Sequence, residues 1–87
     1  MHEEALMRDL RRKIEEVSRT HGGRRVSRVG LRVGALSHIT EATLREKWPM
    51  TFAGTPAEDA RLTIETSSDL NDPRAQGVLL TEVAIEE

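Results

Sequence analysis

Residues 1–23 read MHEEALMRDLRRKIEEVSRTHGG, and the spacing of the apolar residues in this stretch decides how the fold begins. Apolar side chains that recur every three or four positions lie on one face of a helix. The residues in this pattern are Leu6, Leu10, Ile14 and Val17. Two glycines follow His21, and glycine readily adopts the left-handed conformation at which helices end. The sequence therefore predicts a helix over residues 3–21.

The period of the pattern changes after this helix. Residues 24–33 alternate between apolar and polar side chains, which predicts a strand with one buried face. The inward residues are expected to be Val29, Leu31 and Val33, and the outward ones Arg28 and Arg32.

A second helix is predicted to begin after Thr40, because threonine is a good N-cap and Glu41 favours the first turn. Its core-facing residues, spaced by four, are Leu44, Trp48 and Phe52. Pro49 lacks an amide donor and crowds the preceding turn of a helix. We therefore expect a kink or a break between residues 47 and 50.

A capped helical turn is expected at residues 55–58, and strands at 61–66 and 78–86. In the first of these strands Leu62 and Ile64 point inward. Regular alternation in the last strand puts one set on one face, namely Leu79, Thr81, Val83 and Ile85, and the other set on the opposite face, namely Val78, Leu80 and Ala84. The order α-β-α-β-β predicts an α+β fold, with two helices packed on one face of a three-stranded mixed or antiparallel β-sheet.

Composition narrows the classes of function. A chain of 87 residues suits one small domain, and its net charge of -2 gives no overall attraction to nucleic acid or to an anionic membrane. The absence of cysteine excludes disulfides, thiol catalysis and cysteine-zinc sites within the chain. There is no glycine-rich phosphate loop and no recognisable nucleophile–base set, so an enzyme is not expected. No signal peptide or long apolar run is present, so we expect a cytoplasmic protein.

Met1, His2 and Glu3 form a candidate metal site. Methionine aminopeptidases generally spare Met before a bulky second residue, so Met1 is expected to remain. The Met1 amine, the His2 amide nitrogen and the His2 imidazole can then chelate one ion in fused five- and six-membered rings. A planar nitrogen set of this kind suits Ni(II) or Cu(II). The first amides of a helix have no intrahelical acceptor, so giving one to a metal breaks no helical hydrogen bond.

These residues alone leave two alternatives, which concern whether a metal binds and which group is its fourth ligand. The same residues are also what a plain helix start contains, since most N-terminal histidines are solvated chain ends. The chelate also supplies only three planar ligands. The fourth has to be water, the Glu3 carboxylate, His21, His38 or a side chain of a partner protein. His21 is otherwise expected to favour the helix C-terminus, and His38 to be a solvated loop residue.

The chain resembles the HypA/HybF family in four patches that cover nearly all of it. The first patch is Met1-His2-Glu3, and the second consists of Val26, Val29, Leu31, Val33-Gly34 and Leu36-Ser37. The third consists of Gly54-Thr55, Ala57, Ala60, Leu62 and Ile64-Glu65, and the last of Gly77, Leu80 and Ile85-Glu86.

This resemblance implies a metallochaperone that delivers Ni(II) to nickel–iron hydrogenase and sometimes to urease. It implies that Met1 and His2 hold nickel transiently, with Glu3 in the site or beside it. The implied partners are the hydrogenase large subunit or a nickel-delivery GTPase. Residues 1–87 would then be a single nickel-binding domain of the HypA type.

The sequence departs from the family between the last two predicted strands. There the family carries a zinc domain with two Cys-x-x-Cys pairs, whereas residues 67–77 contain neither cysteine nor histidine. We therefore expect a short loop in place of the zinc domain, and no bound zinc.

Two other kinds of function remain. A metal-free HypA-like adaptor would bind a hydrogenase subunit or a maturation factor, and an exposed strand edge would also allow a homodimer. Nucleic-acid binding would use the arginines of the first strand and the residues before it, which include Arg24, Arg25, Arg28 and Arg32. Interleaved aromatic residues for stacking are missing, so we expect these arginines to pair with carboxylates, and neither nucleic acid nor a membrane to be a partner.

Overall fold

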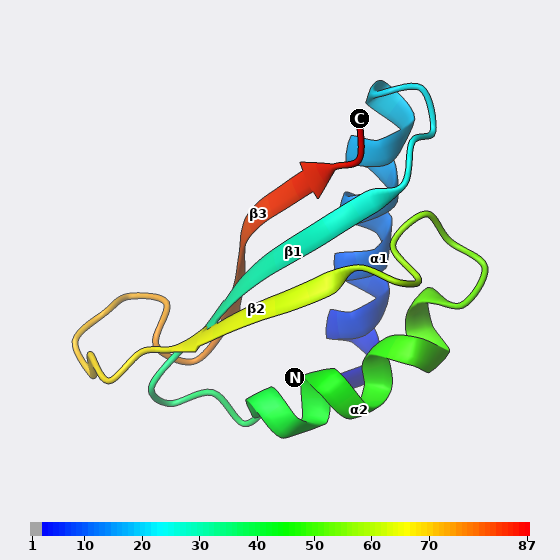
Figure 1. Ribbon diagram of the computed structural model, residues 1–87. Coiled ribbons are helices and arrows are strands. Elements are labelled where there is room, and N and C mark those ends of the chain that lie inside the picture. Colours follow the sequence, from blue (N-terminus) through cyan, green and yellow to red (C-terminus); the bar gives the residue numbers. More distant parts are fainter. Residues whose placement is uncertain (1–2) are drawn as a thin grey trace.

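The computed structural model describes residues 3–87 of the chain. Its elements in order are α1 (Glu3–Thr20), β1 (Val26–Val33), α2 (Glu41–Phe52), β2 (Arg61–Thr66) and β3 (Val78–Ile85) (Figure 1). This order confirms the predicted α-β-α-β-β arrangement. The element types agree with the sequence prediction, and the boundaries differ by one or two residues.

The three strands form a mixed sheet in the order β2-β1-β3. The central strand β1 runs parallel to β2 and antiparallel to β3. Inward residues of β1, such as Val29 and Leu31, share one core with residues of both helices. Both helices therefore cover the same face of the sheet, and α1 lies behind it in the view of Figure 1.

The α1 helix buries a slightly different stripe from the predicted one. Met7 and Ser18 are buried with Leu6, Leu10 and Ile14, whereas Val17 is only half-buried. The Ser18 hydroxyl donates a 2.6 Å hydrogen bond to the Arg24 carbonyl, so a polar group is buried without losing its partner. This bond also ties the end of α1 to the approach to β1.

Of the kink or break predicted at Pro49, the break is wrong, because α2 continues as one helix from Glu41 to Phe52. Pro49 is exposed, and so is Arg45, the residue whose carbonyl would accept a bond from position 49 in a regular helix. Trp48 and Phe52 are buried and stack at a centroid distance of 3.9 Å. We attribute the continuity of the helix to this packing, which offsets the missing hydrogen bond.

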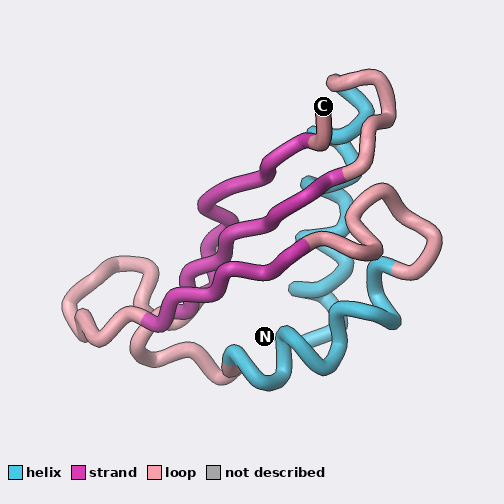
Figure 2. Tube along the Cα trace, in the orientation of Figure 1, coloured by secondary structure: helices cyan, strands magenta, loops and turns pink. Residues whose placement is uncertain are grey.

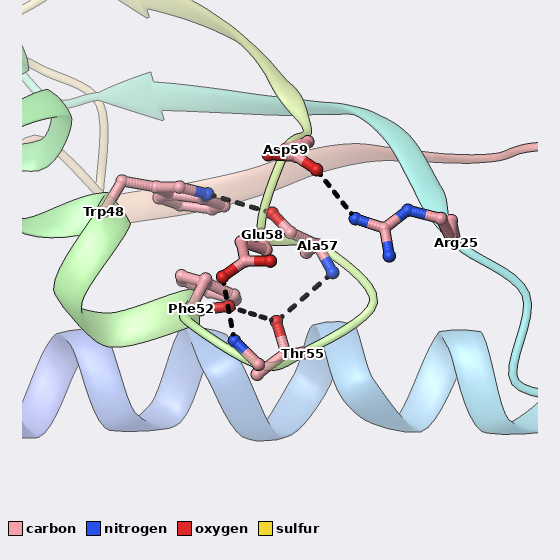
Figure 3. Close-up of polar contacts among 8 residues, drawn as sticks. Arg25, Trp48, Phe52, Thr55, Ala57, Glu58 and Asp59 are labelled. Carbon is pink, nitrogen blue, oxygen red and sulfur yellow. Dashed lines mark hydrogen bonds and ion pairs between the residues drawn. The ribbon is translucent and has the colours of Figure 1, made fainter.

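The connection from α2 to β2 folds back over the stacked aromatic rings (Figure 3). Gly54 follows the helix with a φ of 79°, and the buried Thr55 hydroxyl donates to the Phe52 carbonyl over 2.8 Å. The Trp48 indole donates to the Ala57 carbonyl over 3.3 Å. The capped turn expected at residues 55–58 is present, because Thr55 accepts a 3.2 Å bond on its hydroxyl from the Ala57 amide and a 3.1 Å bond on its carbonyl from the Glu58 amide. It is an isolated hydrogen-bonded turn and does not extend into a helix.

The predicted alternation in β3 is wrong because the strand contains an irregularity. Gly30 pairs with Glu82, but the next residue of β1, Leu31, pairs with Leu80, so the register shifts at Thr81. The residues of β3 that pack against the core are Val78, Leu80, Val83 and Ile85. Sequence periodicity had placed Leu80 and Val83 on opposite faces. One extra residue at a bulge returns both to the same face.

The loop of residues 67–77 joins β2 to β3 and contains no helix or strand. In Figure 2 it lies at one end of the sheet, beside the loop that leads into α2. Hydrogen bonds join the two loops, because the Gly34 amide donates to Gly77 over 2.9 Å and the Leu36 amide donates to Ala75 over 2.7 Å. Ala75 is buried in this contact.

Gly34→Ala is expected to destabilise the protein by about 1–3 kcal/mol, the usual cost of overpacking. A Cβ at position 34 would collide with the backbone carbonyl of Ala75, and backbone yields less readily than a flexible side chain. Urea unfolding measures the effect. The matched control is Gly77→Ala, because a Cβ there lies 3.8 Å from its nearest neighbour, the Arg74 carbonyl. Equal midpoints for the two variants would contradict the close approach of the loops.

Candidate metal centre at the start of α1

Of the three residues predicted to form the metal site, the structure describes only Glu3. Met1 and His2 fall outside the residues that the structure describes, and Glu3 is the first residue of the helix. Glu3 and Glu4 put two carboxylates in the first turn, where the helix dipole is positive. The amides of this turn have no acceptor within the helix, as every helix start requires.

Glu3 is half-buried, and its carboxylate lies 3.5 Å from the Lys47 ammonium of α2. This ion pair connects the start of α1 to the middle of α2. Lys47 was not among the candidate site residues, because no local period relates positions so far apart in the chain. A positive charge beside Glu3 competes with a metal ion for its carboxylate, so Glu3 has to leave Lys47 before it can become a ligand.

A groove runs between the two helices next to this ion pair. The residues that line it are Glu3, Glu4, Met7, Arg8, Arg11, Lys47, Met50 and Thr51. The Arg11 guanidinium donates to the Thr51 carbonyl over 3.1 Å and holds the two helices together. Met50 is 85% exposed, and Met7 is buried in the core. The groove therefore presents an apolar strip between charged rims, directly beside the start of α1.

His21 lies at the opposite end of α1 from the candidate metal centre. The helix contains 18 residues, and at about 1.5 Å per residue its two ends are roughly 27 Å apart. The His21 ring nitrogen Nδ1 donates to the Val17 carbonyl over 2.8 Å, so the imidazole caps one of the last carbonyls of the helix. The structure removes His21 from the possible ligands of a metal held at the start of α1.

His38 lies in the loop between β1 and α2, and its side chain is exposed, as the sequence predicted. It lines a small hollow with Leu6, which belongs to the first turns of α1. Of the two histidines among residues 3–87, His38 is therefore the one near the start of the helix. Within the same residues, no group of three or more His, Asp or Glu side chains is arranged to hold a metal ion.

Three of the arginines considered for nucleic-acid binding pair with carboxylates, as expected. The ion pairs are Arg25–Asp59, Arg28–Glu82 and Arg32–Glu65. Arg28 forms two hydrogen bonds to Glu82, of 3.0 and 2.9 Å. These bonds lower the pKa of the Glu82 carboxyl and raise the pKa of Arg28. The positive charge on the open face of the sheet is thereby largely neutralised.

The helices of the described residues are short or rich in polar side chains. Among residues 3–87, none is both long and apolar enough to cross a bilayer.

Comparison with known proteins gives one consistent family. The family model described as "Hydrogenase/urease nickel incorporation, metallochaperone, hypA" matches residues 1–70. The chain is 35% identical to hydrogenase maturation factor HypA of Nitrosospira multiformis over 65 residues, which are 75% of this chain and 56% of that protein. It is 39% identical to the factor of the same name from Acidithiobacillus ferrooxidans over 66 residues, which are 76% of this chain and 58% of that protein.

A third relative is aligned over nearly the whole chain. The hydrogenase maturation factor HypA of Deinococcus radiodurans is 32% identical over 83 residues, which are 95% of this chain and 69% of that protein. The chain thus spans little more than half the length of the first two relatives and about two thirds of this one. Because the family match covers most of the chain and includes the residues that open α1, the chain belongs to the HypA family of hydrogenase and urease nickel-incorporation metallochaperones.

Proposed function

We propose that this chain binds Ni(II) at its amino terminus and hands the ion on during the maturation of nickel–iron hydrogenase. Two observations together support this proposal. The chain belongs to a family described by nickel incorporation, and its first two residues carry a chelating set of nitrogen atoms directly before α1. The ligands are the Met1 amine, the His2 amide nitrogen and the His2 imidazole.

The start of α1 suits this chelate. The helix begins at Glu3, so the amide nitrogen of His2 precedes the helical hydrogen bonds and is not needed as a donor to them. A cation at the positive end of a helix dipole is disfavoured. Deprotonation of the His2 amide removes one of the two charges of Ni(II), and the carboxylates of Glu3 and Glu4 add negative charge nearby.

Glu3 has two roles in the proposal. While it pairs with Lys47, its carboxylate stabilises the ion through charge alone. Once released from Lys47, it can become a ligand during transfer. An ion pair of this kind is worth little when exposed, so its opening does not obstruct the exchange.

The role proposed is carriage and not catalysis. A chelate on the first residues of the chain is accessible to the ligands of a partner, which can replace its donors one at a time. The partner is proposed to be the hydrogenase large subunit or a nickel-delivery GTPase, in the cytoplasm. The groove between α1 and α2 lies next to the metal centre and offers such a partner the exposed side chain of Met50. Zinc has no part in this proposal.

Extending the chain by two residues before Met1 is expected to lower its affinity for Ni(II) by roughly 10²–10⁴-fold, the usual gain from joining donors in one molecule. The extension converts the amine to an amide and removes one ligand, while all three histidines remain. Calorimetric titration of Ni(II) into the two proteins measures the effect. Equal affinity with and without the extension would show that the amine is not a ligand and would overturn this site.

A further inference from the structure

The outer edge of β2 is the more regular of the two outer edges of the sheet. Within residues 3–87, β2 and β3 flank β1, so each has one side without a strand neighbour (Figure 1). The β3 strand carries a register shift opposite Gly30 and Leu31, and such irregularities hinder pairing with a further strand. The β2 strand pairs with β1 along its whole length without a shift. Its outer edge can therefore accept one more strand.

The hydrogen-bonding groups at this edge belong to Leu62 and Ile64. Successive residues of a strand direct their amides and carbonyls to opposite sides. The Ser67 amide, just after β2, donates to the Val33 carbonyl of β1 over 2.8 Å. The odd-numbered residues of β2 therefore face β1, and the even-numbered ones face outward. In agreement, the Leu62 carbonyl accepts a 3.4 Å bond from the Arg45 side chain of α2.

Two opposite charges border this edge on the open face of the sheet. The side chains of Leu62 and Ile64 pack against the core. Arg61 and Glu65 therefore lie on the opposite face, where both are exposed. Glu65 pairs with Arg32 of β1, and both contacts of this pair go to the carboxylate oxygen Oε1. The second oxygen, Oε2, remains available to another cation.

Arg61 has no carboxylate partner among residues 3–87. Its neighbour in the register with β1 is a second cation, Arg28, which is already paired with Glu82. Like charges opposite each other on neighbouring strands are destabilising. A carboxylate supplied from outside the chain would therefore stabilise the Arg61 guanidinium.

We propose that β2 pairs antiparallel with β2 of a second copy of this chain, about a twofold axis at Thr63. In this register Leu62 of each copy faces Ile64 of the other, so their outward amides and carbonyls exchange hydrogen bonds. Arg61 of each copy faces Glu65 of the other, so each unpaired guanidinium meets an available carboxylate oxygen. The edge is thus complementary to itself, as a twofold interface requires.

The charges select this register over its neighbours. Only shifts by two residues keep the outward-facing backbone groups of the two copies opposite each other. A shift of two residues in one direction puts Thr63 opposite Arg61, and a shift in the other direction puts Thr63 opposite Glu65. Either shift loses both pairs of opposite charges, so the register centred on Thr63 is the favoured one.

The side chain of Arg45 has to leave the edge before the strands can pair. Its 3.4 Å bond to the Leu62 carbonyl is long and therefore weak. Arg45 also donates to Glu41 over 2.9 Å, and this bond is kept when the carbonyl is released. The backbone bond from the second copy then replaces the one that is lost.

The test reverses the two charges one at a time and follows association by sedimentation equilibrium. The concentration series reaches about 1 mM, which detects weak dimers. Arg61→Glu places glutamates opposite each other, and Glu65→Arg places arginines opposite each other. Each variant is expected to raise the dissociation constant of the dimer at least about fivefold, because two favourable cross-strand pairs become unfavourable. Circular dichroism checks that each variant remains folded.

Two further samples separate pairing at this edge from a general effect of charge. The double variant carries both substitutions, so it keeps the original net charge and places opposite charges across the edge again. An equimolar mixture of the two single variants does the same between unlike chains. Both samples are expected to recover the association that each single variant loses. An unaltered protein that is monomeric throughout the series, single variants that associate as it does, or a mixture that stays monomeric would each overturn the proposal.

Discussion

Replacing His2 with glutamine is expected to lower the affinity for Ni(II) by roughly 10²–10⁴-fold, the usual gain from joining donors in one molecule. The substitution removes the imidazole and breaks the six-membered chelate ring, while the amine and the amide nitrogen remain. Glutamine is preferred to alanine here, because a small second residue would expose Met1 to removal and eliminate two ligands at once. Calorimetric titration measures the affinity, and the absorption band of planar nickel should disappear with it.

The control for this variant is His21→Gln, which removes an imidazole from the far end of α1. It should bind nickel as the unaltered protein does. Equal and weak binding by all three proteins would show that the chain carries no specific nickel site. The metal-free adaptor would then be the better account of this family member, and the groove between α1 and α2 the first surface to test for a protein partner.

Phe52→Ala is expected to destabilise the fold by about 3–5 kcal/mol, the usual cost of removing a buried aromatic side chain. Phe52 is fully buried and stacks on Trp48, and its carbonyl accepts the hydrogen bond of the Thr55 hydroxyl (Figure 3). Small domains are stable by only about 5–15 kcal/mol, so the loss is a large share of the total. Urea unfolding followed by circular dichroism measures it.

Met50→Ala is the matched control, because Met50 belongs to the same helix and is 85% exposed. It should change the free energy of unfolding by no more than about 0.5 kcal/mol, as surface substitutions usually do. Phe52→Leu should fall between the two, since leucine refills most of the volume. A Phe52→Ala protein as stable as Met50→Ala would mean that the stacked pair is not the centre of the core.

The nearest agreement between sequence and structure concerns features that depend on local periodicity. The period of α1 and the alternation of β1 show which side of each element faces the core, because apolar residues recur along the chain at the period of the helix or strand. The Thr40 N-cap is equally local, because its hydroxyl bonds to the Thr43 amide three residues later. Such signals need no knowledge of the rest of the fold.

Predictions failed where distant packing overrode a local rule. Pro49 ends many helices, but here residues on both sides of it are held in the core. A bulge in β3 shows itself only when the strand is aligned with β1, since the pairing of Gly30 and Leu31 defines it. The sequence pattern does not predict the burial of Ser18, because the hydrogen-bond partner of its hydroxyl is the Arg24 carbonyl, which lies beyond the end of the helix.

The sequence by itself determined the order of the elements and the α+β class, because each element is recorded in a local period of apolar residues. It also predicts the chelate of Met1 and His2, because the donor atoms belong to adjacent residues of one backbone. Only the tertiary structure decided which distant side chains lie near the first turns of α1. It placed Lys47 against Glu3, His38 near the first turns of α1 and His21 at the other end of the helix. These relations arise from the packing of α1 and α2 on one sheet face, and no pattern along the chain records the contact between two segments that meet only when the core forms.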